Sequence, residues 1–156
     1  MEFTNNLEEA ERLDKLKSKV LRFVLYKKRT ENEVREKFTD IDENDLEDII
    51  KVLKENNYLN DFEYIERSIK EFEALKNLSI KEINYKLLQK KVDKNILDEY
   101  IYSNREALLD FEIKSAKAIL LKKSKTMEIE DIKNYLFSKG YMNESVSIAL
   151  EEFLES

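Results

Sequence analysis

Three segments of the chain superimpose at a constant offset of 49 residues. Val34, Ile83 and Ile132 occupy the same place in the three segments, because 83 − 34 = 49 and 132 − 83 = 49. Further apolar positions follow the same offset: Leu13, Phe62 and Phe111; Val20, Ile69 and Ala118; Phe23, Phe72 and Leu121; and Phe38, Leu87 and Leu136. A repeat of this length is typical of a supersecondary unit that buries its apolar face by stacking on copies of itself. Such an array offers an extended surface instead of one deep pocket, and this favours binding over catalysis.

Each repeat is predicted to contain three amphipathic helices. The first helix of the first repeat should run from about Asn6 to about Lys28, with apolar residues at helical spacing. Thr30-Glu31-Asn32-Glu33 and Ser79-Ile80-Lys81-Glu82 are capping boxes, in which hydroxyl and carboxylate each accept a first-turn backbone N–H. Other predicted helix starts are Asp42, Asp61, Asp93, the segment Ser103-Asn104-Arg105-Glu106, Asn143 and, with a poor capping residue, Glu128. Gly140 is expected to end a helix in the left-handed conformation.

The composition agrees with an all-α fold. The chain of 156 residues has one Gly and no Pro, fewer than a sheet protein with many turns requires. We therefore predict three tandem three-helix repeats, stacked into an elongated, curved array. The predicted repeats are 1–60, 61–102 and 103–156.

Several kinds of chemistry are missing from the sequence. There is no His and no Cys, which excludes Ser–His and Cys–His nucleophiles and the usual zinc sites. A single Gly cannot build a phosphate-binding loop. The segment after Asp40 begins like a calcium loop, but Asp45 and Lys51 replace the required Gly and Glu. We predict a protein that is not an enzyme and has no catalytic residue, cofactor or metal.

No stretch is long and apolar enough for a transmembrane helix, and no signal peptide is predicted. We expect a cytoplasmic monomer that does not bind membranes. The formal net charge is −6, which argues against a general DNA-coating protein.

Basic residues recur at the turn between the first and second helices of each repeat. Lys27, Lys76 and Lys125 are again 49 residues apart, because 76 − 27 = 49 and 125 − 76 = 49. The predicted partner-binding residues are these three and their neighbours Lys28, Arg29, Lys122 and Lys123, together with two aromatic residues, Tyr58 and Tyr64. Stacking should align the bases into a ridge. The simpler explanation is that bases at a helix C-terminus complement the helix dipole.

Three segments resemble the RecX family, bacterial regulators of the recombinase RecA. The segment from Arg29 to Phe38 is similar to the family's opening motif, and the segment from Leu53 to Asp61, followed by Tyr64, to its most characteristic one. The stretch from Ile83 to Val92 resembles the next motif. The sequence departs from the family pattern at Ser79-Ile80 (usually Gly-Pro), Lys90-Lys91 (usually Lys-Gly) and Asn60 (usually Asp), which indicates a divergent member.

The resemblance implies tandem three-helix repeats and a role in regulating RecA. It implies binding to RecA, or to the groove of its filament on single-stranded DNA, and restraint of recombinase activity. Two alternatives stay open: a helical-repeat adaptor with another protein partner, and a weak nucleic-acid-binding module. Co-sedimentation with RecA filaments distinguishes a RecA regulator from an adaptor with another partner. The salt sensitivity of DNA binding distinguishes a nucleic-acid-binding module from both.

Overall fold

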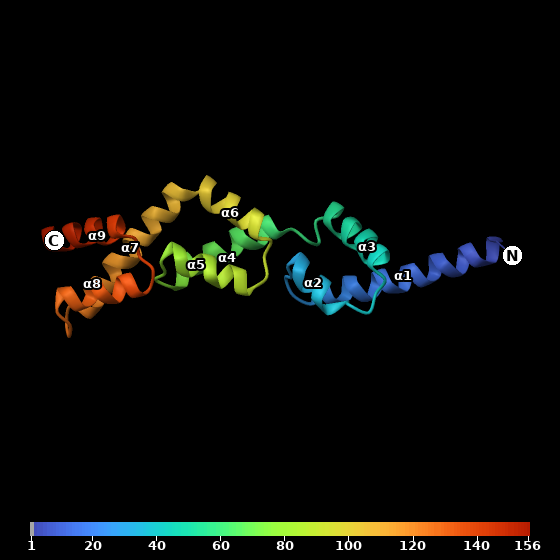
Figure 1. The fold of residues 1–156 in the computed structure, drawn as a ribbon, viewed down its shortest axis with the longest axis horizontal. Coiled ribbons are helices and arrows are strands. Elements are labelled where there is room, and N and C mark those ends of the chain that lie inside the picture. Colours follow the sequence, from blue (N-terminus) through green and yellow to red (C-terminus); the bar gives the residue numbers. More distant parts are fainter. Residues whose placement is uncertain (1) are drawn as a thin grey trace. The chain divides into compact units, whose positions relative to one another are not determined.

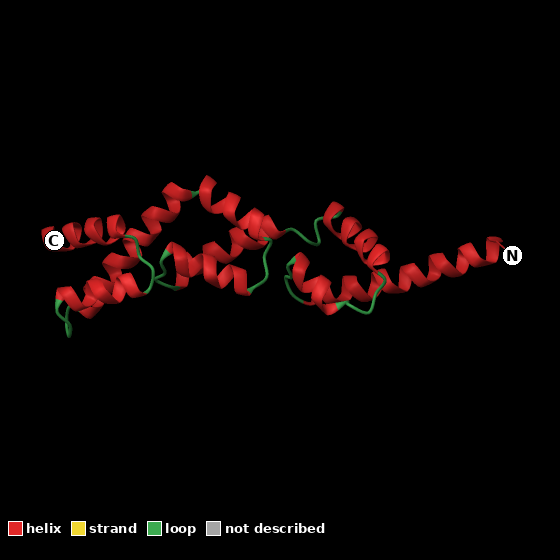
Figure 2. Cartoon of the chain, viewed as in Figure 1, coloured by secondary structure: helices red, strands yellow, loops and turns green. Residues whose placement is uncertain are grey.

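The computed structural model describes residues 2–156, with the side chains of residues 5–156. The described residues form helices and loops, with no strand among them (Figure 2). This confirms the predicted all-α class. The helices are α1 (Glu2–Tyr26), α2 (Glu31–Lys37), α3 (Glu43–Glu55), α4 (Asp61–Leu75), α5 (Ile80–Gln89), α6 (Lys94–Ser103), α7 (Arg105–Lys123), α8 (Ile129–Ser138) and α9 (Asn143–Glu155) (Figure 1).

The chain divides into two compact units. The first unit comprises Met1–Tyr64 and Lys90–Asp93, and the second comprises Ile65–Gln89 and Lys94–Ser156. α4 begins at Asp61 and α7 at Arg105, close to the two boundaries expected between repeats. The division into three stacked repeats stays a prediction.

The core of the first unit lies between α1, α2 and α3. Val20 and Val24 of α1 pack with Val34 of α2 and with a row of residues on α3 and the loops beside it. The Phe23 and Phe38 rings meet edge to face, with their centroids 5.4 Å apart. The last turns of α1 are thereby fixed to α2, because aromatic pairs of this geometry add to the stabilisation from burial.

The core of the second unit includes a cluster from α7, α8 and α9. Ala116, Leu120, Ile132, Leu136, Tyr141, Val146 and Ala149 are its buried members. α7 and α9 pack side by side (Figure 1). Small residues at Ala116 and Ala149 allow this close approach of two helices, because they leave little side chain between the backbones.

The 49-residue offset holds for the second helix of each predicted repeat. Val34, Ile83 and Ile132 are fully buried, as expected from the alignment. Phe38, Leu87 and Leu136, four residues further on, are buried as well. This face of α2, α5 and α8 is therefore the part of the pattern that the sequence predicts correctly.

The offset is wrong for the first helix of the third repeat. The buried residues of α7 lie 51 residues after those of α4. The pairs are Asp61 and Glu112 (112 − 61 = 51), Ile65 and Ala116 (116 − 65 = 51), and Ile69 and Leu120 (120 − 69 = 51). Ala118 is only partly buried and Leu121 is 53% exposed, so the core positions predicted for them are wrong. The cause is a shorter connection between the first and second helices of the third repeat. Ile69 precedes Ile83 by 83 − 69 = 14 residues, whereas Leu120 precedes Ile132 by 132 − 120 = 12 residues.

The capping boxes form as predicted. Thr30 accepts the Glu33 backbone N–H, and Glu33 accepts the Thr30 backbone N–H. Ser79 Oγ accepts the Glu82 N–H at 3.0 Å, and Glu82 accepts the Ser79 N–H at 3.1 Å. Asp42 caps α3 as expected.

Other predicted caps differ from the structure. Asn60, not Asp61, accepts the Glu63 N–H at the start of α4. Met142 holds the N-cap position of α9, where Asn143 was expected, and neither Met142 nor Glu128 makes a side-chain capping bond. Asn104 precedes α7 without capping it and donates to the Tyr100 carbonyl. Met142 has no side-chain oxygen for capping, and Asp61 makes other bonds, described below.

Two residues in the left-handed region terminate the second helices. Gly140 has φ 91°, as the sequence predicts, and Lys91 has φ 66° at the equivalent position, since 140 − 91 = 49. A Cβ at Gly140 would lie 2.8 Å from Lys81 Cδ, so Gly140 also allows Lys81 to pack against the backbone. The conformation favours glycine at this position, and a larger residue would also require the Lys81 side chain to move.

Loss of the capping hydroxyls should be measurable. Thr30→Ala and Ser79→Ala are each expected to lower the free energy of unfolding by about 2 kcal/mol, because each hydroxyl both caps a helix and bonds to a more distant carbonyl. Glu128→Ala should cost under about 0.5 kcal/mol, because Glu128 makes no capping bond. Urea denaturation of the three variants measures these differences. Equal losses at all three positions would contradict the assignment.

Candidate functional site

The first basic turn separates into exposed and structural residues. Lys27 and Lys28 are exposed between α1 and α2. Arg29 instead packs inward: its guanidinium lies 3.9 Å from the centroid of the Phe23 ring, and its Nε donates to the Phe23 carbonyl at 3.3 Å. Only 13% of its side chain is exposed. Lys27 and Lys28 are thus available to a partner, whereas Arg29 stabilises the turn.

The remaining basic turns belong to the second unit. Lys76 follows α4 and is exposed, as are Lys122 and Lys125. Lys123 is half-buried, with its ammonium 4.3 Å from the centroid of the Tyr135 ring. Lys122 and Lys123 lie in the last turn of α7, where a cation complements the helix dipole. The discontinuous ridge that the basic turns would form stays a prediction.

The predicted aromatic residues lie near the start of α4. Tyr58 precedes this helix and is 45% exposed. Tyr64 lies in its first turns and is half-buried. Its backbone N–H donates to the Asn60 carbonyl at 3.0 Å. Tyr58 is the better candidate for a contact, because more of its ring is accessible.

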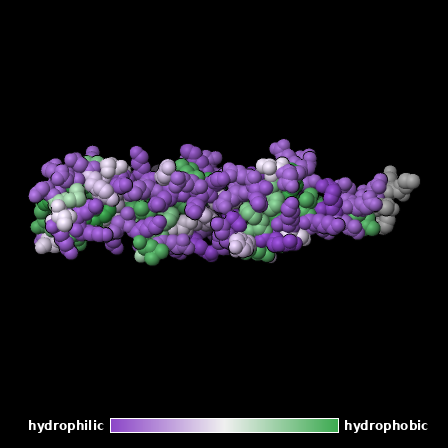
Figure 3. Space-filling model, turned by 90° about the horizontal axis from the view of Figure 1, so that it is seen from below, coloured by the Kyte–Doolittle hydropathy of each residue, from purple (hydrophilic) through white to green (hydrophobic). Residues whose placement is uncertain are grey.

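Hydrophilic residues cover most of the face in Figure 3, with hydrophobic areas between them. Such small separate areas are ordinary for a protein surface. A large exposed apolar side chain comes immediately before the basic residue at two of the turns: Tyr26 is 84% exposed before Lys27, and Leu75 is 80% exposed before Lys76. These two residues correspond in the repeat, since 75 − 26 = 49.

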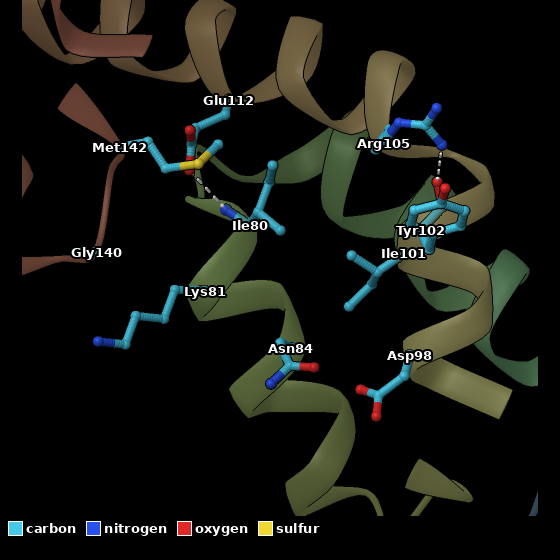
Figure 4. Close-up of a pocket in the computed structure, with 10 residues that line it drawn as sticks. All are labelled: Ile80, Lys81, Asn84, Asp98, Ile101, Tyr102, Arg105, Glu112, Gly140 and Met142. Carbon is cyan, nitrogen blue, oxygen red and sulfur yellow. Dashed lines mark hydrogen bonds between the residues drawn. The ribbon is translucent and has the colours of Figure 1, made fainter. Parts of the chain in front are cut away.

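The second unit contains a pocket of about 560 Å³ that the sequence did not predict. It is lined by Ile80, Lys81 and Asn84 of α5, Asp98, Ile101 and Tyr102 of α6, Arg105 and Glu112 of α7, and Gly140 and Met142 between α8 and α9 (Figure 4). These residues come from segments far apart in the sequence. Its volume is within the range of about 300–1,000 Å³ that is common for ligand pockets.

Charged and polar side chains surround the pocket. The Arg105 guanidinium lies 4.5 Å from the centroid of the Tyr102 ring and donates to the Tyr102 carbonyl at 2.8 Å (Figure 4). Asp98 is paired with Lys94 at 2.9 Å. Among the ion pairs of the described residues, none involves Lys81 or Arg105. Glu112 also lines the pocket, but its carboxylate is completely buried and accepts two hydrogen bonds. The exposed charges at the rim that have no ion-pair partner are therefore the positive ones of Lys81 and Arg105.

Two buried carboxylates join helix ends within their units. In the first unit, Asp61 Oδ1 accepts the Glu31 N–H at 3.0 Å and Asp61 Oδ2 accepts the Asp93 N–H at 2.8 Å. In the second unit, Glu112 Oε1 accepts the Ile80 N–H at 3.0 Å, and Ser145 Oγ donates to Glu112 Oε2. Each carboxylate thus ties the start of a second helix to the start of a third helix.

The capping hydroxyls support the same two junctions. Thr30 Oγ1 donates to the Lys90 carbonyl at 3.2 Å, and Ser79 Oγ donates to the Lys139 carbonyl at 2.7 Å. These pairs are 60 residues apart in both cases. Burial raises the pKa of Asp61 above its ordinary value, against the two backbone N–H groups that lower it.

Sequence reasoning missed Glu112 and gave Asp61 another role. Glu112 is completely buried, whereas acidic residues on a predicted helix usually face solvent. The 49-residue offset also places Asp110, not Glu112, at the position of Asp61. A signal that could have found it is the apolar spacing of α7, in which Leu108, Glu112, Ala116 and Leu120 recur every four residues.

In the part of the chain that the structure describes, no group of three or more acidic side chains could hold a metal ion. None of the described helices has the length and apolar character needed to cross a membrane.

Comparisons with known proteins point to one family. No family model matches the chain. The regulatory protein RecX of Clostridium beijerinckii is 31% identical over 156 residues, covering 95% of this chain and 72% of that protein. Regulatory protein RecX of Clostridium tetani is 30% identical over 150 residues, covering 91% and 68%.

Solved structures agree in fold. The crystal structure of RecX from Lactobacillus salivarius has a TM-score of 0.79 and 21% sequence identity, covering 94% of this chain and 99% of that one. A second crystal structure of regulatory protein RecX has a TM-score of 0.76 and 19% identity, covering 95% and 77%. With the identity and coverage of the clostridial relatives, these findings show that the chain belongs to the RecX family of regulatory proteins.

Proposed function

We propose that this chain binds RecA, or the RecA filament on single-stranded DNA, and restrains recombinase activity. The observation that carries the proposal is the 31% identity to a regulatory protein RecX over 95% of the chain. The proposed regulator acts as a monomer in the cytoplasm, by binding and not by catalysis.

The exposed bases support an electrostatic part of this binding. Lys27, Lys28, Lys76, Lys122 and Lys125 are exposed on a chain with a net charge of −6. Local clusters of one sign steer a charged partner toward the surface even when the whole molecule has the opposite charge. We propose that these bases face acidic parts of the filament or its DNA.

Co-sedimentation tests the proposal most directly. RecA filaments assembled on single-stranded DNA should bring the chain into the pellet, and single-stranded DNA without RecA should do so much less. The chain should also slow DNA-dependent ATP hydrolysis and strand exchange by RecA. A chain that stays in the supernatant with assembled filaments would refute the proposed partner.

Charge reversal at the first basic turn should weaken this binding. The double variant Lys27→Glu and Lys28→Glu is expected to lower affinity for the filament about tenfold, through lost attraction and new repulsion. Arg29 is retained because it packs on Phe23. The residual binding should depend less on salt.

A matched control makes the charge reversal informative. Lys15→Glu with Lys51→Glu makes the same change in net charge at exposed positions of the same unit. This control should bind within about twofold of the parent, because the steering effect is local. Equal losses in both double variants would mean that net charge, not the turn, determines binding.

A further inference from the structure

The pocket of the second unit is an apolar hollow with a positively charged rim. Ile80, Ile101 and Met142 supply aliphatic walls, and Lys81 and Arg105 stand at opposite sides of it (Figure 4). Tyr102 is 69% exposed and Met142 is 44% exposed, so both are accessible to a partner. Tyr, Met and Arg are enriched at protein–protein interfaces, because they combine large apolar area with a polar or adaptable group.

Hydrogen bonds hold the walls of the pocket in place. The Ile80 N–H is bonded to Glu112, and the loop before Gly140 is bonded to Ser79 through the Lys139 carbonyl. Arg105 is fixed on Tyr102 by both stacking and a hydrogen bond. A pocket held in this way loses little conformational entropy when a ligand enters, and this favours tight docking.

The charges around the pocket favour an anionic occupant. Asp98 is already paired with Lys94, whereas neither Lys81 nor Arg105 has an acidic partner among the described residues. Lys81 lies against Gly140, which keeps its stem at the rim. When an apolar group enters the pocket, the groups next to it in the ligand would therefore lie near the Lys81 ammonium and the Arg105 guanidinium.

We propose that this pocket docks a segment of the partner protein that presents one bulky apolar side chain flanked by carboxylates. The proposal rests on the proposed function for the identity of that partner, which is RecA. The apolar side chain would lie against Ile80, Ile101 and Met142, and the carboxylates would pair with Lys81 and Arg105.

A protein segment fits this pocket better than a nucleotide. Bases bind to single-strand-binding proteins by stacking on open aromatic faces. Here the walls are aliphatic, and the Arg105 guanidinium lies against the one aromatic ring, that of Tyr102. A bulky apolar side chain makes full use of aliphatic walls, whereas a base does not.

Two independent variants test the docking. Met142→Arg fills the hollow with a charged side chain, and the double variant Lys81→Glu and Arg105→Glu reverses the charge of the rim. The matched controls are Leu154→Arg, at a position 64% exposed on α9, and the double variant Arg67→Glu and Lys114→Glu, at exposed positions of the same unit. Circular dichroism and thermal melting check that each variant folds.

Fluorescence anisotropy of the labelled full chain titrated with RecA filaments gives the affinities. Both pocket variants should bind at least about tenfold more weakly than the parent, with the controls within about twofold. A parent that binds filaments while both folded pocket variants bind equally well would overturn the pocket and leave the proposed function intact. A parent that does not bind filaments would overturn both.

A parallel titration with single-stranded DNA alone distinguishes the other kind of occupant. Pocket variants that lose affinity for DNA but not for filaments would overturn the protein segment in favour of a nucleotide.

Discussion

Ile132→Asp is expected to lower the free energy of unfolding by roughly 3–5 kcal/mol, because it places a carboxylate in a completely buried and mainly apolar cluster. Ile132 is completely buried among the residues that join α7, α8 and α9. The new side chain must either be protonated or stay charged in an apolar site, and both outcomes cost free energy. Urea denaturation followed by circular dichroism measures the loss.

Leu121→Asp is the matched control for this substitution. Leu121 lies on α7 of the same unit, and the 49-residue offset predicts it to be a core residue. It is 53% exposed, so the same change should cost under about 1 kcal/mol. If Leu121→Asp lowered the free energy of unfolding more than Ile132→Asp does, the observed packing would be contradicted. Leu121 would then be a core residue, as the 49-residue offset predicts.

The contrast between Ile132 and Leu121 shows how far the sequence alone could predict the fold. The second helices are short and begin and end at defined residues, so one offset describes their buried faces and their Thr30 and Ser79 caps. The first helices are longer, and a change of two residues in the connection to the second helix moves their buried stripe. The spacing of apolar residues within one helix shows which face is buried. An alignment of the repeats at a constant offset cannot show that the connection between the first and second helices differs in length from one repeat to another.

The candidate site was less predictable for a physical reason. Basic turns are visible in sequence, yet Arg29 turns inward because its guanidinium stacks on Phe23 and bonds to the carbonyl of the same residue. The pocket depends on α5, α6, α7 and the loop before α9 meeting in space, so its residues share no spacing. Glu112 was missed because a buried carboxylate becomes favourable only when donors from other segments surround it.

The two buried carboxylates should respond differently to conversion into amides. Asp61 accepts two backbone N–H groups, so Asp61→Asn turns its NH₂ group toward a donor and leaves one buried bond unmade. We expect a loss of about 2–3 kcal/mol in the free energy of unfolding. Glu112 accepts one backbone N–H and one hydroxyl, and the hydroxyl of Ser145 can rotate to accept instead of donate.

Glu112→Gln should therefore cost under about 1 kcal/mol, since its carbonyl oxygen keeps the Ile80 N–H and its NH₂ group donates to Ser145. Glu112→Ala removes both bonds and should cost about 3 kcal/mol, with a cavity added to two unsatisfied donors. Combining Glu112→Gln with Ser145→Ala removes the acceptor for the new NH₂ group. The double variant should therefore be less stable than Glu112→Gln alone by more than the Ser145→Ala substitution costs in the parent. Urea denaturation of the single and double variants measures the coupling between the two side chains. Equal losses of stability in Asp61→Asn and Glu112→Gln would contradict this prediction. They would mean that burial of the two carboxylates, and not the kind of donor bonded to each, determines their contribution to stability.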